Sequence, residues 1–489
     1  MTNSAKTKNR AHVASTAPTQ LNVDSFSCDS KFIYRGDSRL DATAYSADAS
    51  RALAAIEASP GFHSPLGQLC GTIWHPVQNQ ARSNFKRIYV DKKHGVAFVG
   101  SREMFFLPLR PERFLSRRIP KLNDLMVPEG WILITRSGTV GNVLYVYNRL
   151  SKCAITDHAI RIEPTRAPAG FLYAFLASRF GKPLITQGMY GSTVDELEPK
   201  HIASIPVPLF DQSIRDDVHA KIVQAYKLRD EANELLDQAE HELYVKMGVD
   251  PFDECDIEYF GDAEKLKAFE IDASDLGERF DATCHIPTAR SAVDKLAKGK
   301  HKLVPLGDRV GSIYLAPRFA RVYVDAEHGT PLLQGSHVLM MRIHALKYIS
   351  NSQTERIERW LIRAGTVLIT CSGTIGRVAV ATKRMDGWAA SQHILRVNAK
   401  PGVSHPGFLA AFLMTGFGQH QLKAHIYGGV VDELTDEDTA RCMIPDVGFK
   451  DQETIGAKVC RAFELRDIAN DLEDTAVGAV EGFICERAN

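Results

Sequence analysis

The stretch Leu133-Ile-Thr-Arg-Ser-Gly-Thr-Val-Gly141 occurs a second time as Leu368-Ile-Thr-Cys-Ser-Gly-Thr-Ile-Gly376. The offset is 235 positions (368 minus 133) in a chain of 489 residues. Solenoid and propeller repeats have periods of about 20 to 50 residues, so a period near half the chain indicates one domain present twice. We therefore expect two related sites, whatever the chain binds.

Other matching stretches flank this one in the same order in both halves. Upstream, Arg39–Thr43 and Phe85–Asp91 match Arg279–Thr283 and Phe319–Asp325. Downstream, the matching pairs are His158 and His393, Gly170–Leu176 and Gly407–Leu413, Tyr190–Leu197 and Tyr427–Leu434, and Leu228–Asn233 and Leu465–Asn470. This conserved order predicts a tandem duplication that covers nearly the whole chain.

Composition is that of an ordinary globular protein. The 59 Lys and Arg residues balance 59 Asp and Glu residues, which excludes a nonspecific polycation but leaves local basic patches open. The nine cysteines include no Cys-x-x-Cys pair, so we expect reduced thiols and a cytoplasmic protein. The most apolar stretch, Gly407 to Phe417, is too short to span a bilayer.

Short segments rich in β-branched and aromatic residues predict strands in each half. They are Arg87–Val90, Ala97–Val99, Trp131–Thr135 and Val143–Tyr147, followed in the second half by Arg321–Val324, Thr366–Thr370 and Val378–Ala381. Between two of these strands, Gly138 and Gly141 permit a turn with positive φ, so Arg136–Gly141 is predicted to be a hairpin loop.

Helices are predicted after the strands of each half. Apolar residues at spacings of three and four predict amphipathic helices around Phe171–Phe180 and Phe408–Leu413 that pack on the strands. Prolines in Ile205–Pro208 and Ile444–Pro445 predict extended exits. Each exit leads into a long polar helix with one apolar seam, formed by Ile214, Val218, Ile222 and Leu235 in the first and by Ile455, Val459, Phe463 and Leu472 in the second. The two seams are expected to pair as an antiparallel coiled coil that holds the two domains apart.

This arrangement resembles the specificity subunit of type I restriction-modification systems, in which target-recognition domains alternate with conserved helices. The resemblance is carried by the two Leu-Ile-Thr-x-Ser-Gly-Thr loops, by Tyr190–Leu197 and Tyr427–Leu434, and by the proline exits followed by Asp211-Gln212 and Asp451-Gln452. The family often has Glu-Gln at that last position. The prefix Arg39–Thr43 and its repeat are a less usual addition, which leaves a related defence system open.

The resemblance implies an α+β fold in which a mixed α/β target-recognition domain is duplicated and each copy is followed by a long helix. The domain limits that we predict are a disordered tail at 1–30, a first target-recognition domain at 31–210, a first spacer helix at 211–248, a connecting segment at 249–299, a second target-recognition domain at 300–449 and a second spacer helix at 450–485.

The same resemblance implies a non-catalytic function. Two domains would read the two halves of a split sequence in double-stranded DNA, while the helices fix the spacing and dock partners. The partners implied are two DNA adenine methyltransferase subunits and, in a complete system, ATP-dependent restriction subunits. S-adenosylmethionine is expected on the methyltransferase, and no cofactor or metal is expected in this chain.

Candidate DNA contacts follow from local charge, because arginine can bridge guanine O6 and N7 or neutralise phosphate. In the first copy they are Arg102, Arg110, Arg113, Arg117, Arg118, Lys121, Arg136, Ser137 and Thr139; in the second they are Arg318, Arg321, Arg342, Arg356, Arg359, Ser372, Thr374 and Arg377. The alternatives are solvated faces for the cations and loop-stabilising hydrogen bonds for the hydroxyls. For His158 and His393 we expect core or capping roles.

Two other classes of function are alternatives to DNA recognition. An enzyme is disfavoured because the chain has no phosphate-binding Gly-x-x-x-x-Gly-Lys-Ser/Thr loop, no His-Glu-x-x-His, no Gly-x-Ser-x-Gly and no Asn/Asp-Pro-Pro-Tyr/Phe methyltransferase motif. The alternative that stays open is a duplicated scaffold that binds protein or carbohydrate through the same loops.

Overall fold

The computed structural model describes residues 45–59, 62–76, 87–191, 195–252, 270–276, 280, 282–285, 287–318, 320–354, 357–426 and 432–488. The predicted N-terminal tail, the prefix Arg39–Thr43, Tyr427 and the candidate contact Arg356 lie outside these residues.

Two sets of elements follow one another in the same order. The first is α2 (Ala47–Ala58), β1 (His63–Pro65), α3 (Leu66–Leu69), β2 (Cys70–Trp74), β3 (Gly95–Val99), β4 (Arg113–Ser116), β5 (Ile132–Thr135), β6 (Val143–Tyr145), α4 (Asn148–Ser151), β7 (Ala154–Ile155), β8 (Ala159–Pro164), α5 (Ala169–Ala177), α6 (Gly181–Gln187), α7 (Pro199–Ser204), β9 (Pro206–Pro208) and α8 (Gln212–Met247). The second is α9 (Pro287–Ala297), β10 (Leu303–Pro305), β11 (Val310–Leu315), β12 (Tyr323–Val324), β13 (Gly329–Leu333), β14 (Lys347–Ser350), β15 (Val367–Thr370), β16 (Val378–Val380), β17 (Ala389–Ala390), β18 (Ile394–Ala399), α10 (Pro406–Met414), α11 (Gly416–Ala424), α12 (Asp436–Ala440), β19 (Met443–Pro445) and α13 (Phe449–Ala488). The predicted duplication and α+β fold class are confirmed.

Each domain is built on a four-stranded antiparallel sheet, in the order β2-β8-β5-β6 in the first copy and β11-β18-β15-β16 in the second. The predicted hairpin is present in both copies, with Leu133 opposite Leu144 and Leu368 opposite Ala379. All four residues of β5 and of β15 are buried, because these central strands are covered on both faces. The loop between the hairpin strands is thereby held at one end of a rigid sheet.

A smaller sheet extends from each domain, in the orders β4-β3-β7 and β12-β14-β13-β17. Each has a small core of its own, formed by Phe98, Leu115, Ile119, Leu125 and Ala154 in the first copy and by Ala316, Leu332, Ile349, Trp360 and Ala389 in the second. The predicted strand Arg87–Val90 is reduced to one bridge between Tyr89 and Leu115. Ile88 and Tyr89 are about half exposed, so little burial stabilises a longer strand there.

The predicted helices after the strands are present as α5 and α10, but they are not amphipathic. Residues 170–176 and 407–413 are buried on all sides, because each helix lies between its sheet and a long helix. A Cβ on Gly170 would lie 2.8 Å from the carbonyl oxygen of His219, and one on Gly407 would lie 2.1 Å from that of Gly456. Glycine is therefore required where each domain sits on its own long helix.

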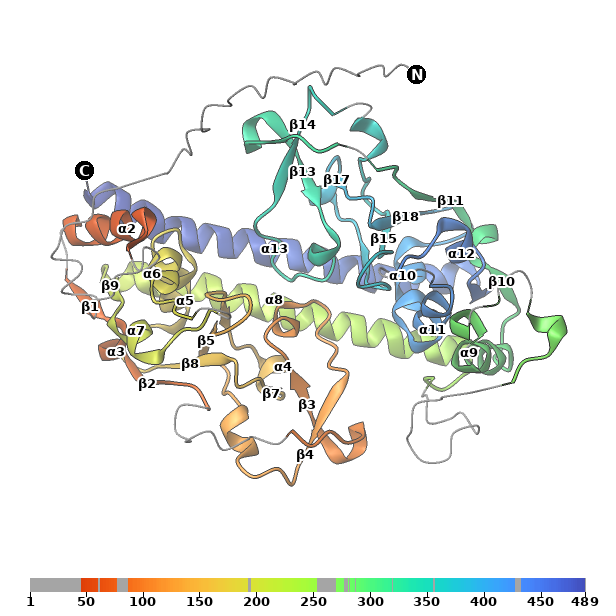
Figure 1. Cartoon of the computed structure of the whole chain (residues 1–489), viewed down its shortest axis with the longest axis horizontal. Coiled ribbons are helices and arrows are strands. Elements are labelled where there is room, and N and C mark those ends of the chain that lie inside the picture. Colours follow the sequence, from red (N-terminus) through yellow and green to blue (C-terminus); the bar gives the residue numbers. More distant parts are fainter. Residues whose placement is uncertain are drawn as a thin grey trace, which may run out of the picture.

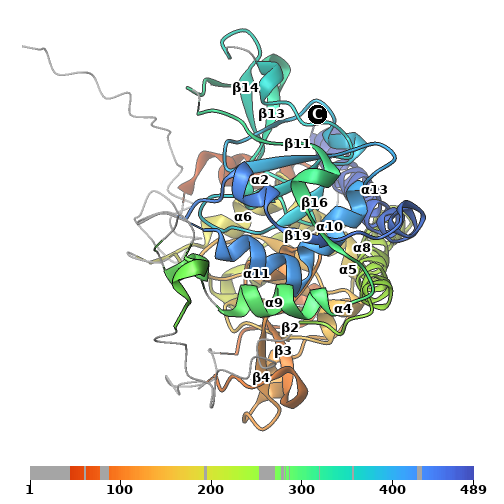
Figure 2. The same cartoon turned by 90° about the vertical axis from the view of Figure 1, so that its right-hand side faces the viewer.

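The helices α8 and α13 pack against each other along the long axis of the molecule (Figure 1). Lys246 bonds Asp451 at 2.7 Å, and Lys458 bonds Glu242 at 2.8 Å, so residue numbers fall on one helix as they rise on the other. The predicted antiparallel pairing is confirmed. In Figure 2 the pair is seen end-on at one side of the molecule, while β3 and β4 extend to one end and β13 and β14 to the other.

Each helix of the pair buries two rows of residues at heptad spacing. In α8 the rows are Val218, Ala225, Ala232 and Ala239, and Ile222, Arg229, Leu236 and Leu243; in α13 they are Ile455, Ala462, Ala469 and Ala476, and Val459, Arg466, Glu473 and Val480. Phe463 is buried beside them. Three predicted seam residues, Ile214, Leu235 and Leu472, are only half-buried. Leu236 is buried in place of Leu235, and Glu473 is buried in place of Leu472.

The two domains also touch each other directly, in addition to being joined by the helices. The Leu107 amide donates to the Leu339 carbonyl at 2.7 Å, and the Met341 amide donates to the Phe105 carbonyl at 2.9 Å. Between these bonds, Phe106 forms an antiparallel bridge with Met340. Strands β3 and β13 begin 234 positions apart (329 minus 95), and 106 plus 234 is 340. Phe106 therefore pairs with its own repeat counterpart, as an approximate two-fold axis requires.

Candidate nucleic-acid interface

The repeated Ser-Gly-Thr loops are closed by the threonine that precedes them. The Thr370 hydroxyl donates to the Thr374 carbonyl at 2.5 Å and accepts from the Arg377 amide at 3.0 Å. Thr135 makes the equivalent bonds to the Thr139 carbonyl and from the Asn142 amide. Gly138 and Gly373 have φ of 79° and 73°, in the left-handed region that favours glycine. Part of each motif is therefore required by the hairpin itself.

The two motifs of each copy belong to one structural unit. Ser137 forms a bridge with Glu196, and Ser372 forms one with Glu433. The Leu197 amide donates to the Arg136 carbonyl at 3.1 Å, and Leu434 does the same to Cys371 at 2.9 Å. The Ser-Gly-Thr loop and the Asp-Glu-Leu segment therefore recur together because they pair through their backbones.

The predicted DNA contacts in the first loop differ in their burial and in their hydrogen bonds within the protein. Arg136 is buried, bonds Glu196 and donates from Nε to the Leu197 carbonyl at 3.2 Å. Ser137 is also buried, and its hydroxyl lies 2.6 Å from Nδ1 of His158. Thr139 is exposed at the tip of the loop. In the second copy Ser372 is half-buried and Thr374 is exposed.

Two buried arginines at equivalent positions of the two repeats were not predicted from the sequence. Arg161 of β8 donates to the carbonyls of Ala159 at 2.7 Å and Ile155 at 3.0 Å, and Arg396 of β18 donates to Ile394 at 2.7 Å and Trp360 at 3.1 Å. Burial lowers the pKa of Arg161 to about 10 and lowers the pKa of Arg396 as well. Each cation joins the central sheet to the small one. The signal was an arginine inside an apolar strand in both repeats.

A buried ion pair lies near the centre of the helix pair. Arg229 and Glu473 are both fully buried, and their Nη2 and Oε2 atoms are 2.6 Å apart. Arg229 also donates to Asn470 at 2.9 Å, and the Tyr173 hydroxyl donates to Glu473 at 2.5 Å. Burial would raise the pKa of Glu473, but Arg229 and Arg342 outweigh it and hold the pKa below its ordinary value of 4.5. The carboxylate is therefore ionised at neutral pH.

Only one side of the approximate two-fold axis carries this pair. Arg466 is the repeat counterpart of Arg229, since the two occupy the same place in the Leu-Arg-Asp motif 237 positions apart (466 minus 229). The counterpart of Glu473 is Leu236, and Arg466 lies 3.4 Å from the carboxylate of its neighbour Asp467. The ion pair distinguishes the two halves of an otherwise symmetric helix interface.

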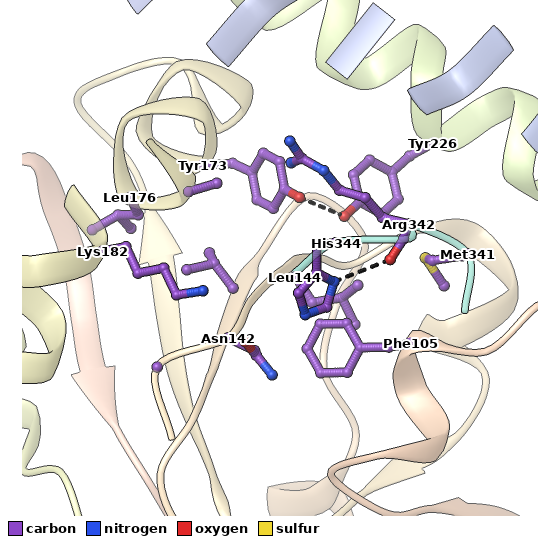
Figure 3. Close-up of a pocket in the computed structure, with 13 residues that line it drawn as sticks. Phe105, Asn142, Leu144, Tyr173, Leu176, Lys182, Tyr226, Met341, Arg342 and His344 are labelled. Carbon is purple, nitrogen blue, oxygen red and sulfur yellow. Dashed lines mark hydrogen bonds between the residues drawn. The ribbon is translucent and has the colours of Figure 1, made fainter. Parts of the chain in front are cut away.

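Arg342, a predicted DNA contact, is engaged inside the protein. It reaches from the second domain to Glu473 and bonds Asp474 at 2.9 Å. Figure 3 shows it above a cavity of about 140 Å³ at the junction of the first domain, α8 and the second domain, beside the hydrogen-bonded hydroxyls of Tyr173 and Tyr226. The geometry gives Arg342 a role in joining the second domain to the helix pair.

The remaining basic side chains of the first copy are mostly exposed. Arg113 stacks on Phe98 and bonds Glu103 at 3.1 Å, while Arg117, Arg118 and Lys121 are exposed between β4 and the next strand. Arg110 is half-buried and bonds Glu240 of α8 at 2.8 Å. Arg113, Arg117, Arg118 and Lys121 therefore lie on or beside the small sheet, which extends away from the helix pair (Figure 1).

The second copy exposes fewer of its predicted contacts. Arg318 is 80% exposed and lies 3.4 Å from Glu433, and Arg359 is exposed beside the small sheet. Arg321 donates to the Gln392 side chain. Arg377 is half-buried at the junction of the two domains, where Arg102 of the first domain also lies. The two copies thus share a fold but present different exposed chemistry.

In the part of the chain that the structure describes, no group of three or more His, Cys, Asp or Glu side chains is placed to hold a metal ion. Within that same part, no helix is both long and apolar enough to cross a membrane.

Several solved protein structures are similar to this chain. No family model matches it, and no curated protein matches it. The S subunit of a type I restriction-modification system from M. genitalium is 10% identical over 87% of this chain and 95% of its own, with a TM-score of 0.36. The HsdS subunit from Thermoanaerobacter tengcongensis is 15% identical over 88% and 96%, with a TM-score of 0.28. A chain from a structure concerning complex assembly of the type I R-M system is 14% identical over 88% and 98%, with a TM-score of 0.27.

Proposed function

We propose that this chain is a sequence-specific DNA-binding subunit that recognises a bipartite target and directs partner enzymes to it, as in type I restriction-modification or a related defence system. The observation that carries the proposal is the two-fold arrangement of two copies of one domain at a fixed spacing. The backbone of duplex DNA has local two-fold axes perpendicular to its length. Two copies related by such an axis can meet equivalent backbone segments while they read different bases.

The spacing supports this proposal quantitatively. Each domain sits on its own long helix through a glycine, Gly170 at His219 and Gly407 at Gly456. The ion pair between Lys458 and Glu242 places Gly456 opposite α8 near residue 243. The two points at which the domains contact the helix pair are therefore about 24 residues apart along it, or about 36 Å at 1.5 Å per residue. One turn of B-DNA is about 34 to 36 Å, so both domains can face the same side of a duplex.

Chemistry at the surface is consistent with two different half-sites. The first copy exposes Arg117, Arg118 and Lys121 beside its small sheet, whereas the second exposes Arg318 and Arg359 at other positions. Within each domain the sheets and the buried Arg161 or Arg396 repeat closely. The two copies therefore share their sheets and buried arginine but differ in the positions of their exposed cations. This is expected of two domains that contact the same DNA backbone and read different base sequences.

Catalysis belongs to partners in this proposal. We expect two adenine methyltransferase subunits that carry S-adenosylmethionine, with ATP-dependent restriction subunits in a complete system. The exposed outer faces of α8 and α13 run the length of the molecule and offer a rigid surface for them. To test this surface, exposed Glu231 is replaced by Arg, which should reduce co-purification with the methyltransferase partner without changing the thermal unfolding of the isolated chain.

The experiment that tests DNA recognition is duplex binding measured against salt. Each phosphate neutralised by the protein contributes about 0.9 to the slope of log K against log salt. We expect a slope that corresponds to several phosphates, and no comparable dependence for binding to an unrelated acidic protein or to oligosaccharides. Duplex affinity that does not change with salt would contradict the proposal and favour a duplicated protein- or carbohydrate-binding scaffold.

A further inference from the structure

A basic cavity lies at the junction of the two domains. It has a volume of about 270 Å³ and is lined by Arg102 of the first domain and by Gly335, Ser336, Ser372, Thr374, Arg377 and His393 of the second. The lining contains two guanidiniums, three hydroxyls and an imidazole, and no acidic side chain. We call these residues the junction site.

The two guanidiniums share one aromatic ring. The Cζ atoms of Arg102 and Arg377 lie 6.0 and 4.9 Å from the centroid of Phe106, the residue that forms the bridge between the domains. Burial, and after it the charge of Arg102, lowers the pKa of Arg377. Among the described residues neither guanidinium forms a salt bridge with a carboxylate. Two guanidiniums that line one cavity without a carboxylate give that cavity a positive charge, which would attract an anion.

The repeat counterparts of the two arginines are not arginines. The repeat offsets of 234 and 235 place Ser336 at the position of Arg102 and Asn142 at that of Arg377. The fold therefore provides two equivalent positions beside the bridge, and only one of them carries paired arginines. The pairing is consequently not a by-product of the duplicated fold.

We propose that the junction site binds one backbone phosphate of duplex DNA, between the two segments that the domains read. This inference rests on the proposed function and specifies a contact within it. A planar guanidinium from each domain would donate to the same phosphate, and the exposed hydroxyl of Thr374 lies at the rim to donate as well. Because one phosphate would join groups from both domains, the contact would couple the two recognition domains through the DNA.

The test uses the full chain and a fluorescein-labelled duplex of mixed sequence, about four helical turns long, with binding followed by anisotropy over a range of salt. Arg102→Gln and Arg377→Gln should each weaken binding about tenfold and reduce the salt slope by about 0.9. The double variant should lose little more than either single variant, because both side chains serve one phosphate. Arg377→Lys, which keeps the charge, should bind more tightly than Arg377→Gln.

Two matched controls accompany these variants. Asn142→Ala changes the equivalent position on the other side of the two-fold axis, and Arg51→Gln removes an arginine that is 79% exposed on α2. Both should leave affinity and slope unchanged. If wild type binds the duplex and the two arginine variants bind equally well, or if their effects multiply and the slope falls by about 1.8, the single-phosphate site is wrong while the proposed function stands. If wild type itself fails to bind, both are wrong.

Discussion

Replacement of Glu473 by Gln tests what holds the helix pair together. The variant keeps the shape of the side chain but removes the charge that faces fully buried Arg229 at 2.6 Å and accepts from Tyr173 at 2.5 Å. Arg229 and Arg342 would keep their positive charges with no buried counter-ion between them. Removal of one partner of a buried pair typically costs ~3–5 kcal/mol, and we expect a loss in that range.

The assay is chemical unfolding followed by far-ultraviolet circular dichroism, which reports on the two long helices. The control is Asp474→Asn, which changes the adjacent carboxylate that bonds Arg342 but is 49% exposed; it should cost less than ~1 kcal/mol. A Glu473→Gln variant whose free energy of unfolding lies within ~0.5 kcal/mol of wild type would refute the reasoning, because a buried guanidinium without a counter-ion should destabilise the fold by more than that.

The effect should also depend on pH. Because the folded protein holds the pKa of Glu473 below 4.5, the ionised carboxylate contributes stability that is fully present above that value. The contribution is lost as pH falls through the folded pKa. The difference in stability between wild type and Glu473→Gln should therefore be constant near neutral pH and shrink below about pH 4.5. A difference that stays constant into strong acid would show that the charge of Glu473 is not the cause.

Three other perturbations have defined outcomes. Gly407→Ala places a Cβ 2.1 Å from the backbone carbonyl of Gly456 and should lower the free energy of unfolding by about 3 kcal/mol, whereas Gly448→Ala, with no atom within 4 Å of its Cβ, should be neutral in the same denaturation assay. Thr135→Val removes the hydroxyl that closes the first hairpin and should cost ~1–3 kcal/mol by thermal unfolding, and a neutral result would contradict the role given to that hydroxyl. Arg117→Gln combined with Arg118→Gln should reduce the salt slope of duplex binding by up to about 1.8, and an unchanged slope would remove these two arginines from the interface.

Repetition made much of the fold predictable from sequence. The hairpin around the Ser-Gly-Thr loop could be placed because two copies showed the same glycines between the same apolar segments, and both loops have the expected positive φ. The long helices could be placed because the proline exits and polar periodicity occurred twice. Repeated patterns reduce the number of competing assignments, since one assignment must fit both copies.

The register of the helix seam could not be predicted from apolar periodicity. Arg229, Arg466 and Glu473 occupy heptad core positions, and a search for apolar residues passes over them. It selects Leu472 beside buried Glu473, and of two adjacent leucines it selects Leu235 where Leu236 is the buried one. Burial of these charges depends on partners distant in sequence, such as the ion pair across the two helices. Propensity and periodicity are local, so they do not contain this information.

Candidate contacts were the least predictable part. Arg136 and Arg342 are the residue type expected of DNA contacts, yet in the structure they form salt bridges with Glu196 and with Glu473. Conversely, the closeness of Arg102 to Arg377 arises from the bridge between two domains, which local sequence does not reveal. Which exposed arginines contact bases or phosphates stays a prediction.

The central claim is that two domains read two separated halves of one duplex, and selection from a random duplex pool tests it most directly. The full chain would be incubated with the pool, bound duplexes would be recovered over several rounds, and their sequences would be aligned. We predict two specified segments with centres about one helical turn apart, separated by base pairs with no preference. A single uninterrupted motif, or two segments with a variable gap between them, would contradict the account.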